Sequence, residues 1–349
     1  MKIFRMKKIT LIFFLCQSFF SVADAQWKKI FQFPNQICSI FFYEDSGSVP
    51  NFGFISTYSD NKIWRTTDGG MTWMNVSYIP TIIVSGSSSI AYHFTFKDKL
   101  TGWCADAFAA PGEPIYRTAD GGITWIALPN SHQLSIHYFK STKRLVGNTA
   151  STIEYSIDDG NTFIQQPMPG VSGFLTIAAN DSNAVISGFN TPLDNTTYTT
   201  DGGISWQQSD NRLGECFQPN GVKHTSLIYA LKEASTPNLL YRSSDFGKSW
   251  VNVFSYPSIF LSNGLSGTVQ SGLFNNVIVQ SYNSKDGVLI SEDSGITFHN
   301  ICGPTNRYDT KFYARDSFIY AGDVSGGLWL NTTAIGSNST PELSSDMLY

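Results

Sequence analysis

Short apolar, β-prone runs alternate with polar turns along this chain. The run Lys62-Ile63-Trp64-Arg65 precedes one such turn, and Trp73-Met74-Asn75-Val76 follows it. Two runs of this kind, joined by a few polar residues and glycines, are typical of a β-hairpin. Because the joining stretch Thr66-Thr67-Asp68-Gly69-Gly70-Met71-Thr72-Trp73 recurs along the chain, the pattern predicts a repeated hairpin.

We call this stretch the turn motif, with the pattern Ser/Thr, x, Asp, x, Gly, x, Ser/Thr, Trp/Phe. Its copies are residues 66–73, 118–125, 156–163, 199–206, 243–250 and 291–298. The carboxylate is expected to accept N–H groups of the residues just after it, as in an Asx turn. The glycine two positions later allows a positive φ, and the closing ring anchors the turn by burial.

The motif aspartates are therefore interpreted as structural. They are Asp68, Asp120, Asp158, Asp201, Asp245 and Asp293. The rival interpretation, six metal-binding or catalytic carboxylates, is disfavoured because each aspartate already has local donors.

The spacing of the motif predicts the fold class. Successive motif aspartates lie 52, 38, 43, 44 and 48 residues apart. A period of about 40–50 residues, with several short strands per unit, is typical of a β-propeller blade. A second pattern, clearest in residues 96–103 and echoed in residues 314–322, predicts a strand, a tight turn and another strand. With the two strands that flank the motif, each unit has four strands.

The two ends of the chain carry complementary defects. Trp27-Lys28-Lys29-Ile30 resembles the strand that follows each motif, yet no motif precedes it. Residues 319–331 supply strands that no motif follows. We therefore predict an all-β fold, a single seven-bladed β-propeller with four-stranded blades, whose last blade is closed by the N-terminal strand. The predicted blades run about 33–75, 76–127, 128–165, 166–208, 209–252, 253–300, and 301–331 with 26–32.

The turn motif resembles the Asp-box, or BNR repeat, of sialidase-type propellers. Its combination with Phe96-x-Asp98-x-x-x-Gly102-Trp103 is similar to the photosystem II stability or assembly-factor type of BNR propeller. The resemblance covers nearly the whole chain after its N-terminal segment. Because the same box occurs in hydrolases, receptors and scaffolds, the resemblance implies an architecture and leaves the activity open.

The N-terminal segment and the charge predict an exported protein. Residues 1–25 combine a positive start, an apolar run from Leu11 to Val22 and an Ala23-Asp24-Ala25 cleavage site, as a signal peptide does. The run is too short to span a bilayer, and Leu15 before Cys16 argues against a lipid anchor. The protein is expected to be secreted, periplasmic or at the cell surface. The formal net charge of −4 gives no basic footprint for nucleic acid.

The C-terminal residues and the cysteines add two open points. Residues 332–349 are polar and predict a linker or disordered tail, while the 26–331 segment forms the propeller. The last three residues resemble the lead-in to a type IX secretion sorting domain. Four cysteines remain after cleavage, which allow three disulfide pairings or buried thiols. They are Cys38, Cys104, Cys216 and Cys302; Cys38 and Cys302 are expected in neighbouring blades.

Candidate ligand-binding residues lie in loops expected on the face opposite the motifs, because ligands of propellers usually meet that face. The candidates are Asp106, Phe108, Glu113, Arg212, Tyr256 and Arg307. The two long loops, 106–114 and 253–268, carry aromatic residues that could stack on sugar rings or fill a partner's pocket. We expect these two loops to share one contact surface.

The residues give little support to enzymatic interpretations. A sialidase would need an arginine triad that begins in Arg-Ile-Pro, which is missing; Arg65, Arg117 and Arg242 share a repeat position and are interpreted as scaffolding. A xyloglucanase-like hydrolase resembles two such propellers with paired acids in the cleft between them, and one propeller is too short for that. Asp106 with Glu113 is the best local carboxylate pair.

Three histidines fall on or near expected innermost strands. They are His93, His137 and His224. Histidines around a channel could bind a metal ion, but no His-x-His or Cys-x-x-Cys spacing supports this. We expect no metal site and no cofactor.

The sequence thus favours an exported, monomeric, non-catalytic propeller that binds a protein or glycan partner as a scaffold. The alternative is a glycoside hydrolase, sialidase-like or xyloglucanase-like, that acts on extracellular glycans. A third possibility, an assembly factor, is implied by the resemblance alone.

Overall fold

The computed structural model describes most of the strands and turns between residues 27 and 331. The described residues are 27–43, 51–58, 62–78, 92–106, 114–129, 131, 135–149, 152–167, 176–179, 182–187, 196–210, 216–221, 226–232, 239–255, 269–271, 277–280, 288–291, 293, 297, 299–301, 311–315 and 318–331.

The described strands form seven antiparallel sheets of four strands each, which we number as blades in chain order. Blade 1 is β2 (Ile37–Phe42), β3 (Gly53–Thr57), β4 (Lys62–Thr66) and β5 (Met74–Tyr78). Blade 2 is β6 (Tyr92–Phe96), β7 (Gly102–Asp106), β8 (Tyr116–Thr118) and β9 (Ile126–Ala127). Blade 3 is β10 (Ser135–Phe139), β11 (Arg144–Asn148), β12 (Ile153–Ser156) and β13 (Ile164–Gln166). Blade 4 is β14 (Thr176–Ala179), β15 (Ala184–Ser187), β16 (Thr196–Thr199) and β17 (Gln207–Gln208).

The remaining blades complete the chain. Blade 5 is β18 (Cys216–Gly221), β19 (Ile228–Lys232), β20 (Leu239–Ser243) and β21 (Val251–Ser255). Blade 6 is β22 (Val269–Ser271), β23 (Val277–Gln280), β24 (Val288–Ser291) and β25 (His299–Ile301). Blade 7 is β26 (Lys311–Arg315), β27 (Phe318–Gly322), β28 (Gly327–Asn331) and the N-terminal strand β1 (Trp27–Gln32).

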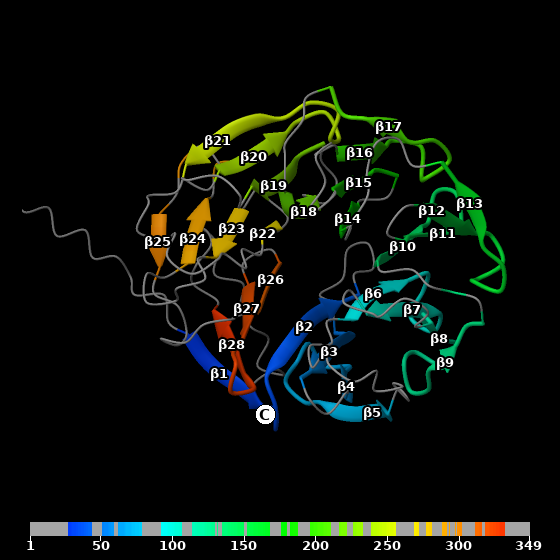
Figure 1. Cartoon of the computed structure of the whole chain (residues 1–349). Coiled ribbons are helices and arrows are strands. Elements are labelled where there is room, and N and C mark those ends of the chain that lie inside the picture. The colour runs from blue at the N-terminus through cyan, green and yellow to red at the C-terminus, as the bar shows by residue number, and fades with distance from the viewer. Residues whose placement is uncertain are drawn as a thin grey trace, which may run out of the picture.

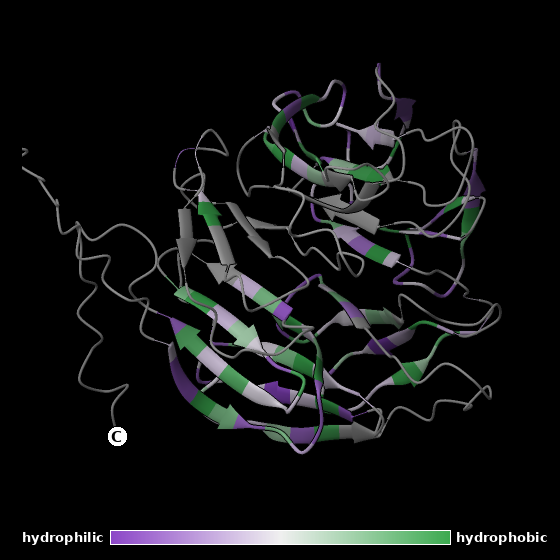
Figure 2. Cartoon of the chain, turned by 60° about the vertical axis from the view of Figure 1, so that its left-hand side comes forward, coloured by the Kyte–Doolittle hydropathy of each residue, from purple (hydrophilic) through white to green (hydrophobic). Residues whose placement is uncertain are grey.

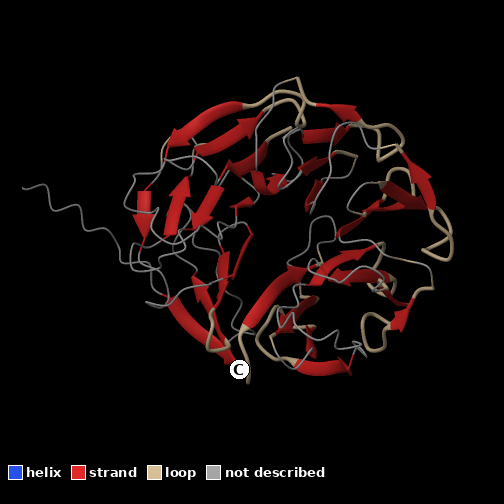
Figure 3. Cartoon of the chain, viewed as in Figure 1, coloured by secondary structure: helices blue, strands red, loops and turns tan. Residues whose placement is uncertain are grey.

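The blades stand in a ring, with the first strand of each blade innermost (Figure 1). Consecutive innermost strands contact one another all the way round, from β2 through β26 and back to β2. Strands are the only regular elements among the described residues, as Figure 3 shows. The predicted all-β propeller class is confirmed. No helix in the described part is long and apolar enough to cross a membrane.

The ring closes where β1 pairs with β28. The register runs from Trp27 opposite Asn331 to Gln32 opposite Gly327, antiparallel and with one irregularity between Lys29 and Phe31. The strand that begins the described chain is therefore the outer strand of the blade that ends it. This pairing covers the edge that β28 would otherwise expose.

Four of the approximate blade boundaries lie one to three residues before the ends of the outer strands. The boundaries after residues 75, 165, 252 and 300 fall inside the outer strands β5, β13, β21 and β25. Each of these strands continues its ladder past the closing ring of the turn motif. The pairing of Lys62 with Tyr78, for example, extends β5 three residues beyond the predicted end.

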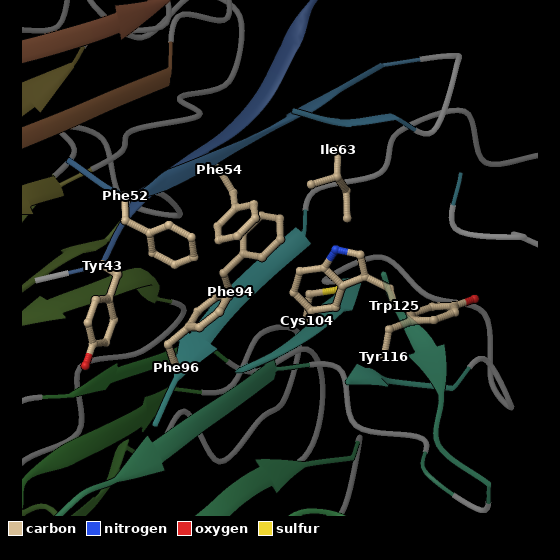
Figure 4. Close-up of a cluster of buried hydrophobic side chains, with 9 residues drawn as sticks. All are labelled: Tyr43, Phe52, Phe54, Ile63, Phe94, Phe96, Cys104, Tyr116 and Trp125. Atoms are coloured by element: carbon tan, nitrogen blue, oxygen red, sulfur yellow. The ribbon is translucent and has the colours of Figure 1, made fainter. Parts of the chain in front are cut away.

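The hydrophobic core lies in the seams between adjacent blades. Apolar and polar residues interleave along the described strands, so that each sheet has apolar positions to offer its neighbours (Figure 2). At the seam between blades 1 and 2, the ring of Phe54 stacks on Phe94 at 5.3 Å and on Phe96 at 5.2 Å, and meets Trp125 edge-on at 5.9 Å. Figure 4 shows this cluster, to which both blades contribute. Ring closure and seam packing together hold the turns in place.

Candidate functional site

The turn motif of blade 2 shows how its aspartate is used. Asp120 Oδ1 accepts the Thr118 hydroxyl at 2.8 Å and the backbone N–H groups of Ile123 at 3.0 Å and Thr124 at 2.9 Å. Asp120 Oδ2 accepts the Thr124 hydroxyl at 2.6 Å. Thr118 Oγ1 in turn accepts the Gly122 N–H at 2.8 Å. Both carboxylate oxygens are thus occupied by the turn itself.

The other copies repeat this arrangement. The equivalent hydroxyl donates to Oδ1 at 2.8 Å in Asp68, 2.7 Å in Asp158, and 2.8 Å in Asp201, Asp245 and Asp293. The residue four positions after each of these aspartates donates its N–H to Oδ1 at 2.8–3.0 Å. The predicted acceptance of following N–H groups is confirmed.

The backbone of the motif needs two consecutive positive φ values, where the sequence pattern predicted one. The glycine two positions after the aspartate has φ of 92° in Gly70 and 79° in Gly122. The residue between the aspartate and this glycine also lies in the left-handed region. Asp159 and Phe246 occupy this position, with φ of 59° and 61°. The pattern missed this position because its residue type varies; Gly-Gly in three copies was the available signal.

The hydrogen bonds hold the motif carboxylates in the charged form. In Asp120, burial would raise the pKa, but the bonds from Thr124, Thr118 and Ile123 outweigh it and lower the pKa. The pKa values of Asp68, Asp201 and Asp245 are lowered against burial in the same way. In Asp158 the N–H of Thr162 is the largest cause of the lowered pKa. These carboxylates are stabilised anions that serve their own turns.

In blades 1–4 the residue after the motif aspartate, here called the joint residue, connects two blades. Its N–H stays within the blade: the Gly121 N–H donates to Leu100 O at 2.9 Å, in the turn between the first two strands. Its carbonyl accepts a donor from the preceding blade. The four bonds are Tyr320 Oη to Gly69 O at 2.9 Å, Arg65 Nε to Gly121 O at 2.7 Å, Trp103 Nε1 to Asp159 O at 3.0 Å and Thr142 Oγ1 to Gly202 O at 2.8 Å. The motifs therefore tie blade to blade.

The seam between blades 2 and 3 adds charge to this connection. Lys97 Nζ lies 3.1 Å from Asp159 Oδ1, and Arg117 lies 3.6 Å from Asp159 Oδ2. The bond to Asp159 raises the pKa of Lys97. Arg65 and Arg117, interpreted as scaffolding, thus both act at seams.

A further aspartate turn, which the sequence pattern missed, lies between β27 and β28. Asp323 Oδ1 accepts the Ser325 N–H, the Ser325 hydroxyl and the Gly327 N–H at 2.8, 2.7 and 2.8 Å, and Oδ2 accepts Trp329 Nε1 at 2.8 Å. Burial would raise its pKa, but these bonds lower it. The signal in the sequence was Asp-x-Ser-Gly-Gly followed by a tryptophan, with a spacing different from that of the turn motif.

The predicted ligand-binding residues lie almost entirely outside the described part of the chain. The structure describes the backbone of Asp106, at the end of β7. Phe108, Glu113, Arg212, Tyr256 and Arg307 fall outside the described residues. Their shared surface, and the pairing of Asp106 with Glu113, stay predictions.

The structure describes some of the histidines and cysteines named in the sequence analysis and not others. His93 and His137 lie on the innermost strands β6 and β10, and His224 is not among the described residues. His93 is half-buried, and burial lowers its pKa to about 4. Within the described ranges, no group of three or more His, Cys, Asp or Glu side chains could hold a metal ion. Cys38 and Cys104 are buried, Cys302 is outside the described residues, and the disulfide pairing stays a prediction.

Sequence comparison relates part of the chain to xyloglucanases. No family model matches the chain. It is 25% identical over 226 residues to the xyloglucanase Xgh74A of Acetivibrio thermocellus, covering 58% of this chain and 24% of that protein. It is 23% identical over 224 residues to a xyloglucanase of a Paenibacillus species, covering 58% of this chain and 19% of that one. The matches thus span about a quarter of the length of these relatives or less.

Structural comparison relates the whole ring to several propellers. YCF48 bound to D1 peptide has a TM-score of 0.61 and 14% identity, covering 90% of this chain and 97% of that one. A virginiamycin B lyase from Staphylococcus aureus has a TM-score of 0.63 and 12% identity, covering 88% and 99%. An ancestral GH74 enzyme has a TM-score of 0.55 and 11% identity, covering 87% of this chain and 46% of that one. At these identities the likeness shows the fold alone.

Proposed function

We propose that this chain is an exported, non-catalytic propeller that binds a protein or glycan partner. The observation that carries the proposal is the use of the motif carboxylates. Asp120 and its counterparts direct their oxygens at their own turns, and the joint residues bind the preceding blade. The repeated carboxylates and carbonyls of the turn motifs therefore serve to hold a rigid scaffold. Binding residues on loops carried by a rigid scaffold are a common arrangement.

The comparisons support this proposal at the level of the fold. One structural neighbour, YCF48, is a propeller of similar extent that was solved with a peptide. Recognition of a protein segment by such a ring is therefore one use to which the architecture is put. We further propose that the turn motif is the Asp-box of the BNR repeat, that the protein reaches the periplasm, cell surface or medium, and that type IX secretion exports it.

Binding and hydrolysis can be separated in one experiment. The purified chain is incubated with immobilised xyloglucan and other plant and bacterial glycans, and retention and released reducing ends are both measured. The proposal expects saturable retention of a glycan, or of a protein ligand in a matched array, without release of reducing ends. Turnover of xyloglucan at enzyme-like rates would overturn it.

A glycoside hydrolase is the second candidate, because the sequence similarity to xyloglucanases extends over 226 residues. Asp106 and Glu113 are the pair proposed to act as acid and base, since glycoside hydrolysis needs two carboxylates across one site. Asp106→Asn and Glu113→Gln should then each abolish hydrolysis while folding is kept. Hydrolysis that survives both substitutions would place the chemistry elsewhere.

A further inference from the structure

Exposed aliphatic side chains gather at the turn motifs. Among the described residues, nine large hydrophobic side chains are exposed. They are Met71, Met74, Leu100, Ile123, Ile126, Ile157, Ile164, Ile204 and Val251. Eight lie within a turn motif or directly after one. The ninth, Leu100, has its carbonyl bonded to Gly121 in a motif. Scattered single exposures need no explanation, but a gathering on one repeated feature does.

The fold of the turn does not require these side chains to be apolar. Asn161 and Lys248 occupy the motif position of Ile123, and Gln207 occupies the repeat position of Ile126. The turn with Asn161 keeps the bond from the fourth residue, because the Thr162 N–H donates to Asp158 Oδ1 at 2.9 Å, as Thr124 does to Asp120. The Asn161 N–H donates to Asp158 O at 3.3 Å, where the Ile123 N–H donates to Asp120 Oδ1. Polar residues therefore serve the same turn, and the exposed Ile123 and Ile126 (47% and 70%) have no role in forming it.

At the seam between blades 1 and 2, these side chains come from both blades. Met74 is the cross-strand partner of Arg65, so the two side chains lie on the same face of the sheet. Arg65 reaches the carbonyl of Gly121 in blade 2. Met74 therefore faces the turn that carries Ile123, beside Leu100.

The next two seams repeat this arrangement. Ile126 is the partner of Arg117, which reaches Asp159 of blade 3, where the turn carries Ile157. Two residues after Ile164, on the same face of its strand, Gln166 Nε2 donates to Ile204 O of blade 4 at 3.1 Å. We call the exposed aliphatic residues of blades 1–4 the rim arc. They are Met71, Met74, Leu100, Ile123, Ile126, Ile157, Ile164 and Ile204.

Charged side chains of both signs lie beside the rim arc, because Asp68 and Asp98 are exposed as well as two lysines. Exposed Lys99 precedes Leu100, and exposed Lys143 follows Thr142, whose hydroxyl bonds the motif that carries Ile204. The aspartates keep their charge but accept hydrogen bonds from their own turns, whereas among the described residues no carboxylate pairs with Lys99 or Lys143. Asp98 Oδ1 accepts the N–H groups of Leu100 and Thr101, both at 2.8 Å, and Asp159 is paired with Lys97.

We propose that the rim arc binds an extended protein segment that carries aliphatic or aromatic residues together with Asp or Glu. The aliphatic side chains at three successive seams supply apolar contact at regular intervals, and the lysines select for acidic residues. The proposal rests on the binding function proposed above and names its partner class. None of the residues of the rim arc belongs to the loops 106–114 and 253–268.

The chain supplies its own test substitutions. Ile123→Asn and Ile126→Gln install residues that other copies of the repeat carry at these positions, so the double variant should unfold at the temperature of the unaltered protein. Val251→Gln is the matched control, because Val251 is exposed at the same repeat position in blade 5, outside the rim arc. If the double variant unfolds early, each single variant is used instead.

The probe is a phage-displayed library of random peptides of about twelve residues, selected on the purified chain. Selected peptides should combine apolar with acidic residues, bind the double variant at least ten-fold more weakly, and bind Val251→Gln as they bind the unaltered protein. Peptides that bind all three proteins equally would overturn the rim arc while leaving the binding function intact. Xyloglucan turnover with no peptide selected would instead overturn the binding function.

Two further measurements separate this partner from other occupants. Sedimentation velocity tests association of the chain with itself, and flotation tests binding to vesicles of phosphatidylcholine with one-quarter phosphatidylglycerol. The proposal expects a monomer and no flotation. Self-association or vesicle binding that is lost in the Ile123→Asn/Ile126→Gln variant would overturn the proposal, because the rim arc would then serve a second copy or a membrane.

Discussion

The six motif aspartates and Asp323 all accept hydrogen bonds from the residues of their own turns, but these turns lie at different places in the blades. Each motif aspartate lies between the third and fourth strands of its blade, and in blades 1–5 the turn is bonded to the preceding blade. Asp323 lies between the second and third strands of blade 7, and its turn holds the linker from β1 to β2: the Phe33 N–H donates to Gly326 O at 2.7 Å. Asp323 is 1% exposed, whereas the motif aspartates are partly exposed.

The two kinds of turn differ in whether the chain already joins the parts that they hold together. Successive blades are joined covalently, so a motif adds a second connection to one that exists. Blade 7 and β1 belong to opposite ends of the chain, so only non-covalent contacts close the ring there. Asp323 buries its charge and binds Trp329 Nε1, which fixes the tryptophan of β28 beside β1. The closing turn should therefore matter more to stability than any repeated turn.

The largest effect is expected from removal of β1. Deletion of residues 26–32 leaves the edge of β28 unpaired and removes the partners of five residues. The melting temperature should fall more than in any single substitution below. Lys28→Ala is the control, since the Lys28 side chain is exposed and its backbone pairing is kept. Unchanged thermal unfolding of the deletion variant would show that β1 does not close the ring.

Asp323→Ala should have the next largest effect. The substitution leaves the N–H groups of Ser325 and Gly327 and the indole of Trp329 without their acceptor. Loss of several buried bonds to a charged group should lower the free energy of unfolding by ~2–4 kcal/mol. Urea denaturation measures this. A loss no greater than that of Asp120→Ala would contradict the special role of the closing turn.

Asp120→Ala should lower the free energy of unfolding by ~1–3 kcal/mol, the usual cost of buried donors without a partner. The donors lost are the N–H groups of Ile123 and Thr124 and two hydroxyls. Partner binding should persist in the folded fraction. A fully folded Asp120→Ala protein that no longer binds would identify a functional carboxylate instead.

The repeated turns were readable from the sequence because each is local. Asp120, its hydroxyl partners and Gly122 all lie within residues 118–124, so a short pattern contains the whole hydrogen-bond set. The joint residue was not readable in this way. Its carbonyl partner can be Tyr320, Arg65, Trp103 or Thr142, four chemistries that lie 56–251 residues away.

The sequence pattern did not predict the Asp323 turn or the rim arc, for related reasons. The tryptophan lies six residues after Asp323, whereas it lies five residues after a motif aspartate, so the motif pattern does not match this turn. The exposure of Ile126 and Ile164 depends on their place at the outer end of a seam, and an apolar residue in a β-prone run predicts burial. The proposed ligand-binding loops lie almost entirely outside the described residues, so their role stays a prediction from the sequence.

Acidification should weaken the ring in two stages. Burial lowers the pKa of His93 to about 4, below the unfolded value of 6.5, so the unfolded chain binds the proton first. Stability should fall as the pH drops from 6.5 towards 4, by roughly 1 kcal/mol at pH 5 for a half-buried ring. Below about pH 3.8 the carboxylates follow, since their folded pKa values are lowered. His93→Gln should remove the first stage alone; a variant that keeps it would assign it to another group.

The smallest effect should separate the charged seam from a neutral one. Lys97 and Asp159 are both partly exposed, so Lys97→Met should cost ~0.2–1 kcal/mol at low salt. The difference from the unaltered protein should disappear in about 1 M NaCl, where charges beyond ~3 Å are screened. Arg65→Met is the comparison, because the acceptor of Arg65 is the neutral carbonyl of Gly121 and its guanidinium lies over the ring of Phe52. Its cost should persist in salt. If salt abolished both costs, Arg65 would act through charge, by its attraction to the Asp120 carboxylate. If it abolished neither, Lys97 would act through its packing and not through Asp159.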